Sequence, residues 1–179
     1  MAAEYDGIIG AFSYAFRTST SRLFKLYVLV SGIATTGIGI FIVIALVVLI
    51  GQTASIQGGS LTLSRAFYVV VGLFIVLPAV APTLAIARRH RQGITASKRL
   101  EAAVAVAGFV FLLSLYLGVV ASMPATFNID GETVTRPPAS GTGVFEPLIT
   151  GLYAVPAGLS WTVPLVGASC IAGTYWLFR

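Results

Sequence analysis

Long apolar stretches alternate with short polar segments along this chain. Four of the stretches are long enough for a helix that crosses a bilayer, which needs about 20 apolar residues. They cover residues 26–50, 66–87, 102–123 and 159–178, and none of them contains Asp, Glu, Lys, Arg or His. The pattern predicts an all-α integral membrane protein that folds as a four-helix transmembrane bundle, with residues 1–179 forming a single membrane domain.

The segments outside these stretches predict three smaller elements. Residues 4–16 place Tyr5, Ile8, Ile9, Phe12 and Phe16 on one helical stripe, which favours an amphipathic N-terminal helix lying on the cytoplasmic leaflet. The outer loop, 124–146, contains an Asp-Gly pair between two strand-like runs, which indicates a short β-hairpin. Residues 147–158 are apolar and end near a proline, so a short helix that enters or lies along the membrane is expected there.

The loop between the second and third stretches has local signals of a helix end and a helix start. Gly93 follows a basic turn and is a candidate C-terminal stop. Thr95 or Ser97 can cap the next helix. Glu101 is expected to pair with Lys98 one turn away.

Composition excludes an ordinary soluble domain. Hydrophobic residues make up 57% of the chain and charged residues only 9%, compared with about 25% charged residues in average globular proteins. A soluble fold of this composition would expose large apolar patches and aggregate. The single cysteine excludes an intrachain disulfide.

Basic residues are distributed unequally between the two sides of the expected bundle. One side carries nine of them and the other only Arg65 and Arg136, which by the positive-inside rule puts both termini in the cytoplasm of a cell-membrane protein. Phe24 and Tyr27 are expected at the membrane border, where aromatic rings gather. Eight of the nine are expected to fix the topology and contact anionic lipid headgroups: Arg17, Arg22, Lys25, Arg88, Arg89, Arg91, Lys98 and Arg99. The ninth is Arg179. Nucleic-acid binding is not expected, because the loop is short and no aromatic residue lies within it, and His90 is interpreted as an interfacial side chain.

Residues for catalysis are sparse. The uncharged spans disfavour a proton-coupled transporter, a pump and a voltage sensor, all of which use charges inside the membrane. We expect no catalytic, cofactor-binding or metal-binding residues and no cofactor. Asp130, Glu132 and Glu146 form the one acidic set outside the spans that merits comparison with a metal or catalytic site, and solvation explains it better.

Small residues and prolines are the distinctive features within the spans. Small side chains let helices approach closely, and the expected packing positions are Gly32, Gly37, Ala103, Ala107, Ala168, Ser169, Ala172 and Gly173. Pro78 and Pro82 remove backbone donors in the second span, as Pro164 does in the fourth. The prolines either shape a kink that serves packing, or open a cavity bordered by Phe74, Pro78, Pro82, Thr83, Ser160, Trp161 and Thr162.

The opening EYDGIIGAFSYAFR and SRLFKLYV, followed by four spans and an RRHRQG loop, resembles small uncharacterised four-span integral membrane proteins of halophilic archaea. The resemblance implies a location and no activity. From the residues we expect a non-catalytic multi-pass membrane protein, not an enzyme, that acts as an accessory or scaffold subunit with other membrane subunits or with itself. The alternative is a small channel or carrier for a neutral solute with a proline-kinked cavity.

Overall fold

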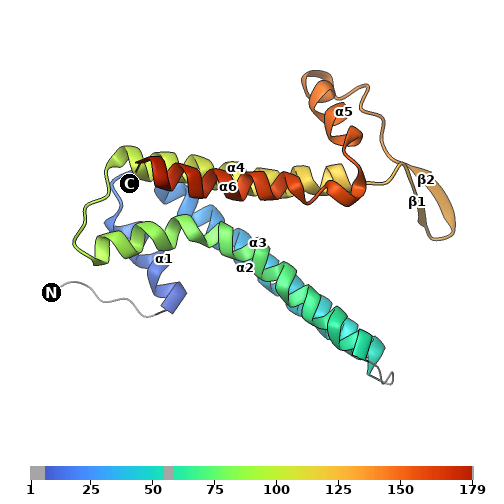
Figure 1. Ribbon diagram of the computed structural model, residues 1–179, viewed down its shortest axis with the longest axis horizontal. Helices are drawn as coiled ribbons and strands as arrows, with labels where there is room; N and C mark the ends of the chain where they lie inside the picture. Colours follow the sequence, from blue (N-terminus) through green and yellow to red (C-terminus); the bar gives the residue numbers. More distant parts are fainter. Residues whose placement is uncertain (1–6, 55–58, 179) are drawn as a thin grey trace.

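The computed structural model describes residues 7–54 and 59–178, and helices dominate these residues (Figure 1). The elements in chain order are α1 (Gly7–Thr18), α2 (Arg22–Thr53), α3 (Gly59–Arg91), α4 (Lys98–Ser122), β1 (Thr126–Ile129), β2 (Glu132–Thr135), the 3-10 turn η1 (Gly143–Phe145), α5 (Glu146–Ala154), the 3-10 turn η2 (Ala157–Leu159) and α6 (Thr162–Phe178).

Four of these segments are long and apolar enough to cross a membrane. They are Arg22–Thr53, Arg65–Arg91, Lys98–Ser122 and Ala157–Phe178. Each contains or closely matches one of the four apolar stretches, and the helices extend past them because charged residues are tolerated at helix ends. The prediction of four apolar helices is confirmed.

The long helices pair as two hairpins that meet at one end and diverge from it (Figure 1). The first hairpin consists of α2 and α3, and the second consists of α4 and α6, which have the most extensive contact of any two elements. Helix α1 lies against α2 and α3 near the junction, where the α3–α4 loop is also found. We call this junction the basic end, because residues 17–25 and 88–99 lie there. The far ends of the two hairpins are not held together by comparable contacts.

Two glycines allow the tight packing around α4. A Cβ on Gly108 would overlap the ring of Tyr27 on α2, and one on Gly167 of α6 would overlap Ser114 of α4. Ser114 instead donates its hydroxyl to the Phe111 carbonyl oxygen at 2.7 Å, which satisfies this buried polar group within its own helix.

The buried core near the basic end corrects one expectation. Phe24 and Tyr27 are fully buried among α1, α3 and α4 rather than at an exposed border. The Tyr27 hydroxyl donates to the Ala79 carbonyl oxygen at 2.6 Å, so its polar group is satisfied inside the bundle. The rings of Phe24 and Tyr27 are buried because α1 and α4 cover this side of α2.

Helix α1 is present from Gly7 and continues to Thr18, two residues past the predicted end. The predicted start, with Tyr5, lies outside the described residues. Ala11 and Ala15 are the positions that α1 buries, whereas Ile9 is 89% exposed. Phe12 is half-buried and packs over Gly32 of α2. The predicted apolar stripe therefore remains mostly on the outer surface, and small residues make the contact with the bundle.

The predicted β-hairpin in residues 124–146 is confirmed. β1 and β2 pair antiparallel with Ile129 opposite Glu132, and the turn between them has φ of 52° at Asp130 and 89° at Gly131. These angles are those of the tight turn that Asp-Gly favours. The hairpin projects away from the long helices (Figure 1). Arg136, just after it, stacks 3.9 Å from the ring centroid of Tyr153 on α5.

Candidate functional site: a buried carboxylate at the junction of the hairpins

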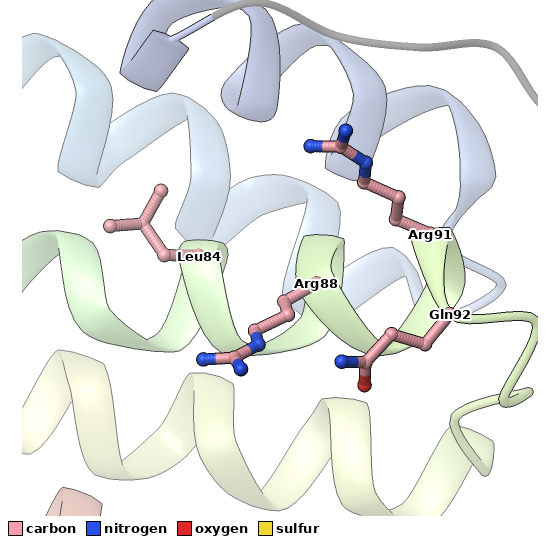
Figure 2. A pocket seen from close by; sticks show the side chains of 4 residues that line it. All are labelled: Leu84, Arg88, Arg91 and Gln92. Atoms are coloured by element: carbon pink, nitrogen blue, oxygen red, sulfur yellow. The ribbon is translucent and has the colours of Figure 1, made fainter.

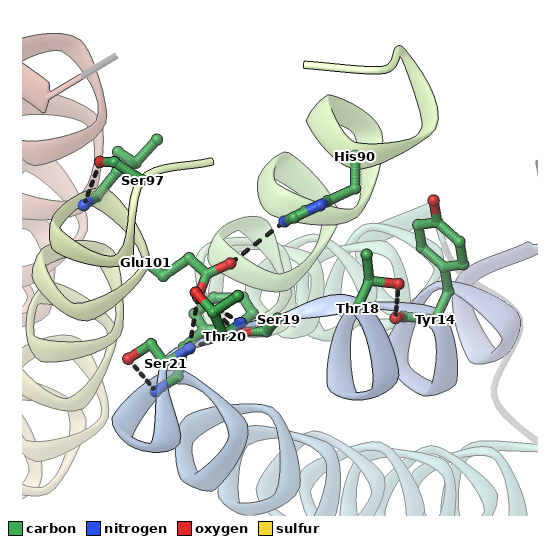
Figure 3. A network of polar contacts seen from close by, with 10 residues as sticks. Tyr14, Thr18, Ser19, Thr20, Ser21, His90, Ser97 and Glu101 are labelled. Carbon is green, nitrogen blue, oxygen red and sulfur yellow. Dashed lines mark hydrogen bonds and ion pairs between the residues drawn. The ribbon is translucent and has the colours of Figure 1, made fainter. Parts of the chain in front are cut away.

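A buried carboxylate occupies the junction of the two hairpins (Figure 3). Glu101, in the first turn of α4, is fully buried. Its Oε2 atom accepts hydrogen bonds from Ser19 Oγ at 2.7 Å, Thr20 N at 3.0 Å, Thr20 Oγ1 at 3.3 Å and Ser21 N at 2.7 Å. His90 Nε2, at the end of α3, lies 3.2 Å from Oε1. We call Ser19, Thr20, Ser21, His90 and Glu101 the Glu101 network.

Local sequence explains the donors of this network. Helix α1 ends at Thr18, and α2 begins after the N-cap Ser21, whose hydroxyl accepts from Phe24 N. The three residues between the helices include Thr20 and Ser21, whose backbone N–H groups have no partner within either helix. Glu101 supplies the acceptor from a different helix.

Helix electrostatics favour the same arrangement. The carboxylate is close to the N-terminal ends of α2 and α4, where the helix dipole stabilises a negative charge. His90 is in the last turn of α3, where the helix dipole stabilises a positive charge. A charge that is buried must be paired or hydrogen-bonded to be tolerated. Glu101 meets this requirement through five contacts from two other segments.

The Glu101 network connects four helices through a single side chain. One carboxylate joins the α1–α2 corner, the end of α3 and the start of α4. Within the described residues, no group of three or more His, Cys, Asp and Glu side chains could hold a metal ion. Asp130, Glu132 and Glu146 are exposed.

The expected pairing of Glu101 with Lys98 is wrong. Lys98 is exposed, whereas Glu101 points inward to the α1–α2 corner and His90. The sequence does contain a signal of this burial. Glu101 is on the same helical face as Val104, Ala105 and Gly108, three, four and seven residues later, all of which are buried.

An apolar groove of about 370 Å³ lies between α3 and the α4–α6 pair. Pro78 and Pro82 line it, as the cavity hypothesis expected, but the other side is formed by Ala168, Ile171 and Ala172 among others. Helix α3 continues through both prolines.

The remaining residues of the expected cavity lie elsewhere. Phe74 is 74% exposed and Thr83 is fully buried with its hydroxyl unpartnered among the described residues. Ser160 and Thr162 donate to the Ala157 and Leu159 carbonyl oxygens in their own segment, and Trp161 is exposed.

The expected packing residues divide into two groups. Ala107 is buried, and Gly32, Ala103 and Ala168 are half-buried within the bundle. Gly37, Ser169, Ala172 and Gly173 are exposed. Gly108 and Gly167, which make the closest approaches, were not among the residues that the sequence singled out.

The expected headgroup residues are all at the basic end. Arg17 lies in the last turn of α1, Arg22 and Lys25 lie in the first turn of α2, and Lys98 and Arg99 lie in the first turn of α4. Arg88, Arg89 and Arg91 form the last turn of α3. Most are exposed, although Lys25 and Arg89 are half-buried, and Lys25 Nζ lies 5.7 Å from the ring centroid of Phe16.

Fold and site together define a helical protein with four helices long and apolar enough to cross a membrane, joined at one end by a buried carboxylate. The chain belongs to the family described as Domain of unknown function (DUF8056), whose model matches residues 1–179. Neither a curated protein nor a solved structure matches the chain.

Proposed function

We propose that this protein is a non-catalytic multi-pass protein of the cell membrane, with both termini in the cytoplasm, that serves as an accessory or scaffold subunit of a larger membrane complex. The observation that carries the proposal is a set of small residues left uncovered on two helices. Gly37 on α2 and Ser169, Ala172 and Gly173 on α6 are exposed. A Cβ on Gly37 or Gly173 would meet nothing within 4 Å.

Exposed small residues are important because the hydrophobic effect does not drive helices to associate within a bilayer. Helix pairs in a membrane are stabilised by close packing, which small side chains allow. Within this chain Gly108 and Gly167 make such close approaches. Gly37 and the Ser169–Gly173 pair offer the same kind of surface to a helix of another subunit or of a second copy.

The divergence of the two hairpins supports the same proposal. The most apolar stretch of α2 has no residues buried within the chain. In the most apolar stretch of Ala157–Phe178, only 11% of the residues are buried. The two faces therefore remain open to another apolar helix along most of their length. The Glu101 network holds the hairpins at one end, which sets the angle at which a partner meets them.

Mild-detergent extraction from native membranes tests the proposal. Wild type is expected to migrate on a native gel as a complex larger than the 18.7 kDa chain. Gly37→Leu and Gly173→Leu should shift it toward the monomer, because leucine prevents close approach while favouring the helix itself. Gly51→Leu is the matched control, since Gly51 is also an exposed glycine with free space but lies about 21 Å farther along α2 than Gly37. A wild-type protein that is a lone monomer in every mild detergent would contradict the proposal.

The groove lined by Pro78 and Pro82 favours a second candidate, a carrier for a neutral or apolar solute. Reconstituted liposomes are expected to pass such a solute faster than empty liposomes if this is the function. Ala168→Leu would place a larger side chain in the groove and should reduce the flux. Flux no greater than that of empty liposomes would eliminate the carrier.

A further inference from the structure

The face of α1 that points away from the bundle is apolar and exposed. Ile8 is 58% exposed, Ile9 89% and Phe16 42%, and the exposed Ser13 lies between the last two on the same side of the helix. We call these four residues the α1 outer face. The first charged residue of α1 comes only in its last turn. Ten consecutive uncharged residues therefore precede it.

Helix α1 packs beside the apolar parts of α2 and α3. It begins alongside α3 and runs toward the basic end, where it joins α2 (Figure 1). Ala11 and Ala15 are buried in one core cluster with Ile86, which belongs to the second apolar stretch of the sequence. Phe12 packs over Gly32, about 10 Å along α2 beyond the last charged residue at the start of that helix. The first half of α1 is therefore at the level of apolar residues in its neighbours.

Basic side chains accompany α1 at the basic end. Arg17 lies in its last turn, and Lys25 Nζ lies 5.7 Å from the ring centroid of Phe16. On α3, Arg88 and Arg91 line a surface pocket but extend to opposite sides of the helix, Arg88 toward α4 and Arg91 toward α1 (Figure 2). A helix with an apolar face and basic residues beside it is typical of segments that bury the apolar face at the boundary of lipid headgroups and acyl chains. Long basic side chains reach from there to the headgroups.

The shape of the α1 outer face favours lipid over a partner helix. Helices that pack closely in a membrane use small residues at the contact, such as the exposed Gly37 and Gly173. The three bulky apolar side chains of the α1 outer face would instead hold a second helix at a distance. Acyl chains are flexible and can follow such an uneven surface. Leu29, which precedes Gly32 on α2 by about one turn, is 52% exposed, so apolar surface is also open on α2 at this level.

We infer that α1 inserts its outer face into the cytoplasmic leaflet, with Ile8, Ile9 and Phe16 against lipid acyl chains and Arg17 at the headgroups. The partner of this surface is lipid and not another protein subunit. The inference rests on the proposed membrane insertion and orientation, but not on the accessory-subunit role. Because α1 leads directly into the α1–α2 corner, its lipid contact also fixes the segment that donates to Glu101.

Fluorescence of a labelled cysteine tests the inference in liposomes that contain the purified full chain. Cys170→Ala removes the single cysteine of the chain, and Ile9→Cys then carries a nitrobenzoxadiazole label on the α1 outer face. Thr95→Cys is the matched control, because Thr95 is exposed in the α3–α4 loop at the same end of the molecule. The label at residue 9 should emit at a shorter wavelength than the label at residue 95. Lipids with a nitroxide on the acyl chain should quench it more strongly, and iodide on both sides of the membrane should quench it less.

Two results would overturn the inference. Equal quenching of the two labels by iodide would show that the α1 outer face is in water. Protection of residue 9 from both iodide and the nitroxide lipid would show that protein covers this face. A carbonate wash of native membranes distinguishes the levels: a chain that washes off contradicts the proposed membrane protein itself, whereas a retained chain with residue 9 in water contradicts only the insertion of α1.

Discussion

Removal of the Glu101 carboxylate should destabilise the protein strongly. In Glu101→Ala, the Ser19 hydroxyl remains buried but loses its acceptor, and the buried Ser21 N–H keeps only its longer hydrogen bond to Ser19 Oγ at 3.3 Å. A buried donor without a partner costs about 1–3 kcal/mol, and the weakened Ser21 donor adds up to as much again, so the expected loss is about 1–6 kcal/mol of unfolding free energy. The donors of Thr20 add less, because this residue is exposed and water can replace the carboxylate there. Glu101→Gln keeps the shape and one oxygen, and it should lose about 1 kcal/mol for each hydrogen bond that is no longer charge-assisted.

Unfolding of the purified chain in mixed micelles by a denaturing detergent, followed by circular dichroism, measures these free energies. Glu132→Ala is the control, since it removes a carboxylate from the exposed strand β2. A change at such a surface position should stay within about 0.5 kcal/mol of wild type. If Glu101→Ala were as stable as Glu132→Ala, the network would not hold the hairpins together and the reasoning would be refuted.

The remaining predictions concern packing, capping and orientation. Gly108→Ala should cost about 1–3 kcal/mol in the same unfolding experiment, because its methyl group overlaps an aromatic ring of α2. Ser97→Ala should cost about 1 kcal/mol, because the Ser97 hydroxyl accepts from the first turn of α4 at 3.1 Å. With Cys170 replaced by alanine, a cysteine in place of Asn128 should react with an impermeant maleimide on intact cells, whereas one in place of Thr95 should react only after permeabilisation.

Each of these predictions has a direct contrast. Gly37→Ala is the control for Gly108→Ala. Because there is free space at Gly37, the Gly37→Ala variant should not destabilise the isolated chain. Equal stability of the two alanine variants would contradict the close approach of α2 and α4. A Ser97→Ala variant as stable as wild type would show that the cap contributes nothing. Equal labelling of the two cysteines on intact cells would contradict the proposed orientation.

Elements with a local cause could be predicted from the sequence. The four long helices follow from uncharged apolar length, and the β-hairpin follows from Asp130-Gly131. The end of α3 and the start of α4 also have local signals. Gly93 has a φ of 74°, as expected for a helix stop, and Ser97 was one of two candidate caps. In each case the residues that determine the structure are neighbours in the chain.

Features that depend on distant residues could not be derived in this way. The burial of Phe24 and Tyr27 depends on where α1 and α4 pack, and helical periodicity within α2 does not reveal that. The partners of Glu101 in the α1–α2 corner are 80 to 82 positions away. Small residues indicate that helices can pack closely, but not which helix face is covered. Their division between inner and outer faces depends on the divergence of the hairpins, which apolar composition does not determine.

The Glu101 network also fixes when the α1–α2 corner can be buried during synthesis of the chain. The chain is synthesised from its N-terminus, so the α1–α2 corner is made before its acceptor exists. Both helices of the first hairpin must be complete before Glu101 is added at the start of α4. Until then, Ser19 and Ser21 need water for their donors and the corner cannot be buried at low cost. The donors of the α1–α2 corner can therefore be satisfied within the chain only after the start of α4 has been made, whereas a truncated first hairpin leaves them to water.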